Sequence, residues 1–276
     1  NLAAVSDLEA DRARKHGEAN EVPWYTNFET MLDEEHIDAV HICTPPQTHL
    51  NIGRTVLNYG VPILVEKPAA MNTAEVEELI EAADSAGAVA GVMYNRLFQP
   101  SVREGLRRVE TGEIGDVVAV DHTYARDTDL DDTMRGDWVF EMAGSGIGEG
   151  LPHQIYLPLA FVEGLGEVSC VTTRRFGNYD VSFDGICIEA IDEARQAIVS
   201  IKRLSNTPTQ DVLTVYGTEG SIRVDMLKQS VIKKDTRGGI SADTLITENV
   251  SEVTQLMTGF IENAIGFAAR TIYRKL

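Results

Sequence analysis

Short apolar runs alternate with longer amphipathic segments through the first part of the chain. The runs have the length of strands, whereas the segments between them place apolar residues at helical spacing. The expected strands are Leu2–Val5, Trp24–Tyr25, Asp38–Cys43, Ile63–Val65 and Val89–Met93, and the expected helices are Leu8–Gly17, Phe28–Glu35, Gln47–Tyr59 and Thr73–Ala86. Helices alternating with short apolar strands predict an α/β fold with a doubly wound parallel sheet.

The pattern changes after Arg96, where strands separated by turn signals replace the alternation. The expected helices here are Ser101–Glu110, Gln154–Val162 and Val253–Tyr273, and the expected strands are Asp116–Tyr124, Val168–Arg174, Gly185–Ile191, Ala197–Arg203, Asp211–Tyr216, Ser221–Val224 and Val231–Lys233. This predicts an α+β domain with one open, mainly antiparallel sheet. We therefore divide the chain into a dinucleotide-binding domain, 1–96, and a substrate and oligomerisation domain, 97–276.

Composition narrows the possible partners. The chain has 276 residues, of which 43% are hydrophobic, so it is long enough to bury a sizeable core. Its formal net charge of -19 argues against nucleic acid and anionic membranes as partners. The acidic residues are spread along the chain, which favours a solvated acidic surface over an interaction surface for a basic partner. We find no apolar run long enough to cross a bilayer.

The three cysteines, Cys43, Cys170 and Cys187, lie in apolar, strand-like stretches. An odd and sparse count favours reduced thiols and a cytoplasmic location. None of them has CxxC spacing, so we expect no metal site built from cysteine.

Asp7 follows the first apolar run of the chain. An acid at the end of such a strand holds the adenosine ribose in a dinucleotide-binding domain, and the glycine loop that grips the phosphates is expected roughly 20 residues upstream. Only six residues precede Asp7. Either the fingerprint is absent, or the first strand, glycine loop and helix lie outside this chain, as the start without Met favours. On spacing alone, Asp7 is equally a ribose ligand or an ordinary helix cap.

A glycine-rich run, "GSGIGEG" at Gly144–Gly150, is not that loop. It lacks the GxGxxG spacing, follows no clear strand and lies in the second domain. We interpret it as a turn that brings the backbone close to another group. Pro152 is comfortable only in a first helical turn, so Glu149 is expected in the loop before the helix.

Four stretches together carry a family resemblance. They are "AVSD", which ends at Asp7, "ICTPPQTH" at Ile42–His49, "VEKP" at Val65–Pro68 and "GSGIGEGLPHQIY" at Gly144–Tyr156. Their order resembles the glucose–fructose oxidoreductase / inositol dehydrogenase (Gfo/Idh/MocA) family, from the second strand of its dinucleotide domain onward. The resemblance implies an NAD-dependent oxidoreductase that moves hydride between nicotinamide and a secondary hydroxyl of a sugar, cyclitol or related polyol.

The resemblance also implies the catalytic residues. Lys67 would contact the nicotinamide ribose and the substrate hydroxyl, where its charge stabilises an alkoxide-like oxygen. His153 would accept the hydroxyl proton, which suits a group that titrates near neutrality. Glu149 stands where the family usually has aspartate, and Tyr156 stands where many members carry another aspartate, which puts the substrate in doubt. Without the resemblance, Lys67 reads equally as an ion-pair partner of Glu66, and His153 as a satisfied helix histidine.

The cofactor and substrate residues follow from the same resemblance. A carboxylate at Asp7 accepts hydrogen bonds from both ribose hydroxyls and repels a 2′-phosphate, so NAD is preferred over NADP. The remaining residues implied at the cofactor are Thr44, Pro45, Pro46, His49, Glu66, Lys67, Asn95 and Arg96. Those implied on the substrate side are Tyr124, Arg126, Asp137 and Trp138. The broad face of the open sheet predicts a homo-oligomer, either a dimer or a tetramer.

Two other functions fit the same scaffold. One is a non-catalytic, cofactor-binding regulator, which fold alone does not exclude. The other is an NAD-dependent glycoside hydrolase that oxidises its substrate only transiently. The presence of both Lys67 and His153 favours the dehydrogenase over the regulator, and net formation of NADH distinguishes it from the hydrolase.

Overall fold

The computed structural model describes residues 1–127, 144–175, 183–235, 246–259 and 261. The chain forms two compact units, Asn1–Met93 and Tyr94–Leu276. Sequence analysis places the boundary nearby, after Arg96. Of the sequence-predicted site residues, Asp137 and Trp138 lie outside the described residues, as does most of the expected helix Val253–Tyr273 beyond residue 259.

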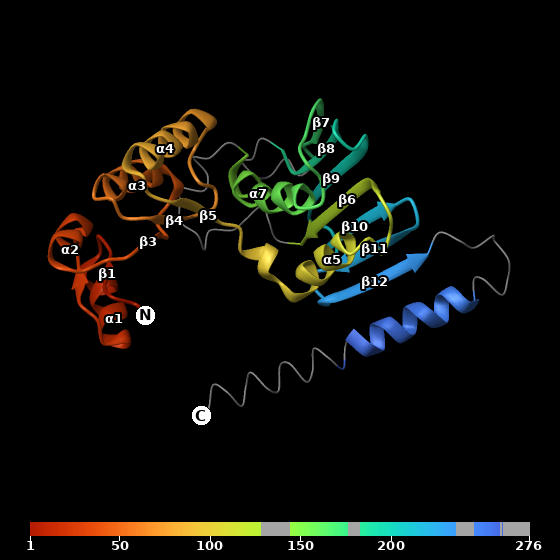
Figure 1. The fold of residues 1–276 in the computed structure, drawn as a ribbon, viewed down its shortest axis with the longest axis horizontal. Coiled ribbons are helices and arrows are strands. Elements are labelled where there is room, and N and C mark those ends of the chain that lie inside the picture. The colour runs from red at the N-terminus through yellow and green to blue at the C-terminus, as the bar shows by residue number, and fades with distance from the viewer. Residues whose placement is uncertain (128–143, 176–182, 236–245, 260, 262–276) are drawn as a thin grey trace. The chain divides into compact units, whose positions relative to one another are not determined.

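The first unit alternates strands with helices, as the pattern of apolar residues predicts. Its strands are β1 (Val5–Ser6), β2 (Trp24–Tyr25), β3 (Val40–Ile42), β4 (Ile63–Glu66) and β5 (Ala90–Met93), and its helices are α1 (Ala10–Asn20), α2 (Phe28–Glu34), η1 (Pro46–Thr48), α3 (His49–Asn58) and α4 (Thr73–Ala86). β1 and β2 form one parallel pair, and β3, β4 and β5 form a separate parallel sheet (Figure 1). The predicted α/β class is confirmed.

Helices α3 and α4 cover one face of the β3–β4–β5 sheet. Val56 and Leu57 of α3 are fully buried and share a core with Ile42, Ile63 and Val65 of the strands. Side chains alternate along a strand, so His41 and Glu66 project from the face opposite to this core. The same sheet therefore has an apolar, covered face and a second face that carries ionisable side chains.

The second unit is built on a seven-stranded sheet of order β12-β11-β10-β6-β9-β8-β7. Its strands are β6 (Val117–Arg126), β7 (Val168–Thr173), β8 (Gly185–Asp192), β9 (Ala197–Ser205), β10 (Gln210–Gly217), β11 (Gly220–Asp225) and β12 (Ser230–Asp235), and its helices are η2 (Asn95–Phe98), α5 (Pro100–Glu110) and α7 (Ser145–Leu159). Every pair of neighbours in this sheet is antiparallel except β6 and β9. The predicted open, mainly antiparallel sheet is confirmed.

Helices α5 and α7 pack against one face of this sheet. Val102 of α5 and Leu157 of α7 are buried in one core with Val199 and Leu213 of the strands. At the end of the sheet, the Gln255 side-chain amide bonds to both the N–H and the C=O of Lys233 in β12. These two bonds satisfy the outward-facing backbone of one residue, Lys233, of this edge strand.

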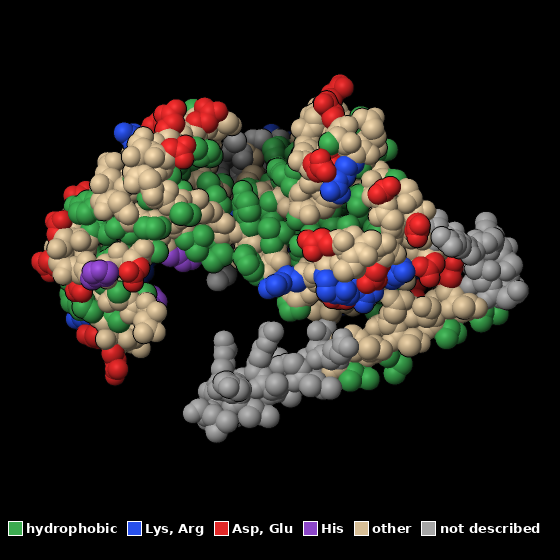
Figure 2. Space-filling model, viewed as in Figure 1, with side chains coloured by type: hydrophobic (Ala, Val, Ile, Leu, Met, Phe, Trp, Pro, Cys, Tyr) green, Lys and Arg blue, Asp and Glu red, His purple; other side chains and the backbone are tan. Residues whose placement is uncertain are grey.

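Charged side chains are scattered over the surface in the way the sequence predicts. Figure 2 shows Asp and Glu side chains spread over the visible surface of both units rather than gathered in one patch. Among the described residues, no helix is both long and apolar enough to span a membrane.

The start of α7 corrects a sequence-based expectation. The helix begins at Ser145 rather than at Gln154, so it includes Glu149 and carries Pro152 in its interior. Glu149 is therefore a buried helical residue, not a loop residue. Tertiary packing overrides the poor helix propensity of this segment: Ile147 is buried against Ile186, and a Cβ on Gly150 would lie 2.9 Å from a guanidinium nitrogen of Arg203.

Candidate functional site

In the first unit, candidate residues gather where parallel strands end. Thr44 comes two residues after β3, and Lys67 comes directly after β4. The carboxyl ends of parallel strands are the edge at which α/β sheets bind ligands. The peptide bond between Lys67 and Pro68 is cis. The topology thus brings the loop Thr44–Pro46 and the lysine loop to the same edge of the sheet.

His49 joins these two loops. It is fully buried at the start of α3, with Nδ1 3.0 Å from the carbonyl oxygen of Pro68 and Nε2 2.7 Å from that of Thr44. Either neutral tautomer donates to one of these carbonyls, and the imidazolium form donates to both. The Thr48 hydroxyl bonds to the Thr44 hydroxyl at 2.6 Å and strengthens the same turn. His49 therefore supports the cofactor loop from within the unit, and direct contact with the cofactor stays a prediction.

Asp7 is engaged on both carboxylate oxygens. Oδ1 accepts the backbone N–H of Glu9 at 2.9 Å, and Oδ2 pairs with Nε of Arg12 at 2.7 Å. The first contact is a turn bond to Glu9, the N-cap residue of α1, so Asp7 is not itself the cap of that helix. The second contact places a guanidinium beside the carboxylate. Asp7 is partly exposed, so neither contact removes it from solvent.

In the second unit, the side chain of His153 is backed by Tyr156 on the same helix. Nδ1 of His153 lies 2.6 Å from the Tyr156 hydroxyl oxygen, which lies 3.4 Å from Oδ1 of Asn95 and accepts the backbone N–H of Arg96 at 3.3 Å. The Tyr94 ring stacks on Tyr156 with centroids 4.4 Å apart. Burial raises the pKa of Tyr156 to about 12, so its hydroxyl keeps its proton at neutral pH.

A buried charged network lies in the same unit. Arg96 Nη1 is 2.5 Å from Oδ2 of Asp211, whose Oδ1 is 2.9 Å from Nε2 of His122. His122 Nδ1 is 3.2 Å from the carbonyl oxygen of Gln154, and Arg203 donates to Oε1 of the same glutamine at 2.9 Å. These contacts link η2, β6, β9 and β10 to α7, the helix that carries His153.

Tyr124 lies between two charges of this network. The guanidinium carbons of Arg96 and Arg203 are 5.5 Å and 4.8 Å from the centroid of its ring. Cations within about 6 Å of an aromatic face are attracted to it. Tyr124 is buried and Arg126 is half-buried at the end of β6, so neither is a simple surface residue.

Sequence reasoning missed Asp211, Arg203 and His122 as members of this network. The available signal was alternation along strands: Asp211 continues the inward row of Leu213 and Val215, and Arg203 continues that of Ile201. A charge in an inward-facing row needs a buried partner. From the sequence alone, that rule would have identified Asp211 and Arg203 as charged residues with buried partners.

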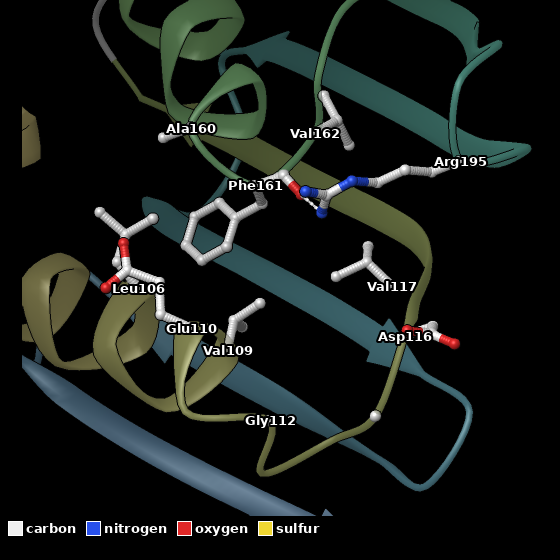
Figure 3. Close-up of a pocket in the computed structure, with 11 residues that line it drawn as sticks. Leu106, Val109, Glu110, Gly112, Asp116, Val117, Ala160, Phe161, Val162 and Arg195 are labelled. Atoms are coloured by element: carbon white, nitrogen blue, oxygen red, sulfur yellow. Dashed lines mark hydrogen bonds between the residues drawn. The ribbon is translucent and has the colours of Figure 1, made fainter.

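A separate hollow of about 740 Å³ opens in the second unit near the ends of α5 and α7 (Figure 3). Its lining is mixed apolar and charged, comprising Leu106, Val109, Glu110, Gly112, Gly115, Asp116, Val117, Ala160, Phe161, Val162 and Arg195. Arg195 Nη1 donates to the carbonyl oxygen of Phe161 at 3.3 Å. None of the sequence-predicted site residues that the structure describes lines this hollow.

Two family models match the chain. Residues 1–94 match the model described as "Oxidoreductase family, NAD-binding Rossmann fold", and residues 102–223 match the "GFO/IDH/MocA C-terminal domain". The fold and these matches define the class of protein: an oxidoreductase with an NAD-binding Rossmann domain followed by a second, sheet-based domain. Within that class, the chain belongs to the GFO/IDH/MocA family.

Named relatives include several dehydrogenases. The chain is 26% identical to "Oxidoreductase P35" of Formosa agariphila over 95% of its own length and 79% of that relative, and 26% identical to a levoglucosan dehydrogenase of Pseudarthrobacter phenanthrenivorans over 79% of its own length and 62% of that relative. It therefore spans less than two thirds of the second protein.

Solved structures share the fold. A levoglucosan dehydrogenase in complex with NADH has a TM-score of 0.76 at 21% identity, covering 88% of this chain and 68% of that one. An inositol dehydrogenase homolog from Azotobacter vinelandii, complexed with NADH and myo-inositol, has a TM-score of 0.75 at 20% identity, covering 87% and 66%.

Proposed function

We propose that the protein is an NAD-dependent dehydrogenase that transfers hydride between nicotinamide and a secondary hydroxyl of a sugar, cyclitol or related polyol. The observation that carries this proposal is the bond between Nδ1 of His153 and the buried Tyr156 hydroxyl. It fixes the imidazole on α7 and makes Nε2 the nitrogen that exchanges a proton with substrate. The names of the levoglucosan and inositol dehydrogenase relatives support the substrate class.

The proton that leaves the hydroxyl is taken by His153. To accept a proton at Nε2, neutral His153 carries its own hydrogen on Nδ1, so Nδ1–H donates to the Tyr156 oxygen and the Tyr156 hydroxyl donates to Oδ1 of Asn95 both before and after the transfer. The distances of 2.6 Å and 3.4 Å allow this sequence of bonds. Tyr156 keeps its proton throughout because burial holds its pKa at about 12. It orients the base and stabilises the imidazolium without becoming an anion.

Lys67 supplies positive charge to the oxygen as hydride leaves the same carbon. An ammonium aimed at developing negative charge lowers the barrier by electrostatic stabilisation. NAD, when bound, supplies the hydride acceptor. The contact of His49 with the carbonyl oxygen of Pro68 holds the backbone next to the lysine.

The other site residues keep the roles that the family resemblance implies. We propose that Glu149 is a catalytic residue beside Lys67 and His153. We propose that the residues at the cofactor are Asp7, Thr44, Pro45, Pro46, His49, Glu66, Lys67, Asn95 and Arg96. We propose that those at the substrate are Tyr124, Arg126, Asp137 and Trp138, within a homo-oligomer. Asp7 is a carboxylate beside the first strand, which supports NAD over NADP.

Alanine variants of the two catalytic residues test the proposal. In the full-length gene product, Lys67→Ala and His153→Ala should each lower turnover with NAD and a panel of sugars and cyclitols by roughly 10²–10⁴-fold, the contribution typical of a positioned acid–base or electrostatic group. Binding of NADH, followed by fluorescence, should persist in the His153 variant.

Matched controls are exposed residues of the same type. Lys228→Ala and His36→Ala change side chains that are 70% and 93% exposed, and both should turn over like the wild type. Near-wild-type turnover in both Lys67→Ala and His153→Ala would contradict the proposal. NADH binding without turnover on any member of the panel would favour the regulator instead.

A further inference from the structure

Three potential metal ligands meet on the face of the β3–β4–β5 sheet opposite to the core that it shares with α3 and α4. His41 lies within β3, Cys43 is the first residue after that strand, and Glu66 is the last residue of β4. Their ligand atoms, an imidazole nitrogen, a thiol sulfur and a carboxylate oxygen, all lie within 4.8 Å of one another. His41 Nε2 and Glu66 Oε1 are 3.5 Å apart.

The strand register explains why these side chains converge. β3 and β4 are parallel, with His41 opposite Leu64 and Ile42 opposite Val65. Ile42 and Val65 point into the core beneath α3 and α4, so the residues that alternate with them point to the opposite face. Ligands carried on neighbouring strands are held more rigidly than ligands on loops.

We propose that His41, Cys43 and Glu66 form a binding site for Zn²⁺. A set of one nitrogen, one sulfur and one oxygen donor suits Zn²⁺, whereas Mg²⁺ and Ca²⁺ select oxygen donors. The His41 and Glu66 side chains are 41% and 33% exposed, and Cys43 is exposed as well. The ion thus has a path of entry from solvent, and water completes a tetrahedral site.

Two of the three ligands directly precede residues of the proposed active site. Cys43 directly precedes Thr44, and Glu66 directly precedes Lys67. A bound ion would therefore tie together the ends of the two strands that carry the proposed cofactor loop and the proposed catalytic lysine. The absence of CxxC spacing, which predicted no metal site built from cysteine, does not exclude this set of ligands, because Glu66 lies on a different strand from His41 and Cys43.

Cobalt is the probe that tests this site. Co²⁺ occupies zinc sites and shows an intense near-ultraviolet charge-transfer absorption only when a thiolate is among its ligands. We expect the reduced, cofactor-free protein to develop this band with one equivalent of Co²⁺ and to lose it when Zn²⁺ is added. Cys43→Ser should abolish the band, whereas Cys170→Ser, at another exposed cysteine, should keep it.

Two further variants separate the site from simple thiol binding. His41→Ala and Glu66→Gln should each weaken Zn²⁺ binding in calorimetry by roughly 10- to 100-fold or more, since even groups that only support a metal ligand carry that much affinity. Circular dichroism of each variant checks that it is folded. A wild-type protein without the band, or a band that survives Cys43→Ser, would overturn the proposal. Because the readout is metal ligation, its failure leaves the proposed dehydrogenase activity untouched.

Discussion

The hydroxyl of Tyr156 is the smallest feature on which the proposed chemistry of the second unit depends. It contacts Nδ1 of His153 and receives the backbone N–H of Arg96. A base held in this way has one defined nitrogen for substrate. Tyr156 is thus a positioning residue, and its role can be separated from that of the stacked ring.

Tyr156→Phe removes the hydroxyl and keeps the ring. We expect kcat to fall by roughly tenfold, about 1.4 kcal/mol of transition-state stabilisation, with little change in KM. The imidazolium of His153 loses its acceptor, so the acidic limb of the kcat/KM–pH profile should move to lower pH. Tyr94→Phe keeps the stacked ring next to Tyr156 and should leave the profile unchanged. An unshifted profile in Tyr156→Phe would refute the positioning role.

Asp7 is the residue proposed to determine cofactor choice, and its carboxylate pairs with Nε of Arg12 at 2.7 Å. Asp7→Ser removes the charge that repels a 2′-phosphate and releases the Arg12 guanidinium. The ratio of NADPH to NADH affinity should rise by roughly tenfold, which is 1.4 kcal/mol. Asp11→Ser, which breaks the neighbouring pair with Arg14, is the matched control. A constant ratio in both variants would count against Asp7 as the ribose ligand.

At the scale of elements, α4 has a well-formed N-terminus. The Asn72 side chain accepts the backbone N–H of Glu75 at 3.0 Å, and the Glu75 carboxylate accepts that of Met71 at 3.0 Å. The first bond satisfies a donor that the first turn of a helix leaves without a partner, and the second ties the residue before the cap to that turn. The helix carries Leu79 and Ala83 into the core of the first unit.

Asn72→Ala should therefore lower the free energy of unfolding by about 1 kcal/mol, the typical cost of losing such a cap. Urea denaturation followed by circular dichroism measures it. Asn58→Ala, at the exposed last residue of α3, should cost less. Equal losses in the two variants would mean that the cap bond contributes nothing.

Local signals explain which elements the sequence predicts well. Helix Thr73–Ala86 is predicted with its observed bounds because Asn72 and Gly87 mark both ends. The start of α7 is predicted wrongly because its glycines and Pro152 read as a turn, whereas burial of Ile147 and the close approach of Arg203 to Gly150 hold the helix. Packing with distant residues is not visible in a local pattern.

The candidate site divides in the same way. His153 and Tyr156 are three residues apart, so their contact follows once the helix is known. The contacts of Asp211 with Arg96 and His122 depend on which strands are neighbours in the sheet. The sequence also does not show that β6 pairs with β9 in parallel within an otherwise antiparallel sheet. Sequence periodicity gives strand positions but not their order in the sheet.

At the scale of the whole molecule, the outer face of the seven-stranded sheet stays open in the described residues. Val118, Ile198 and Tyr216 are exposed apolar side chains on its strands. Exposed apolar area of this kind marks interaction surfaces. It supports the expected homo-oligomer, and a monomer by light scattering would contradict that expectation.

The fate of one hydrogen atom tests the central claim most directly. The sugar or cyclitol that gives the most NADH is prepared with deuterium on the carbon that is oxidised, and the NADH formed is examined by NMR. The account predicts deuterium at C4 of the nicotinamide and the matching ketone as product. NADH without deuterium, or release of a leaving group with no net NADH, would contradict hydride transfer from a secondary alcohol.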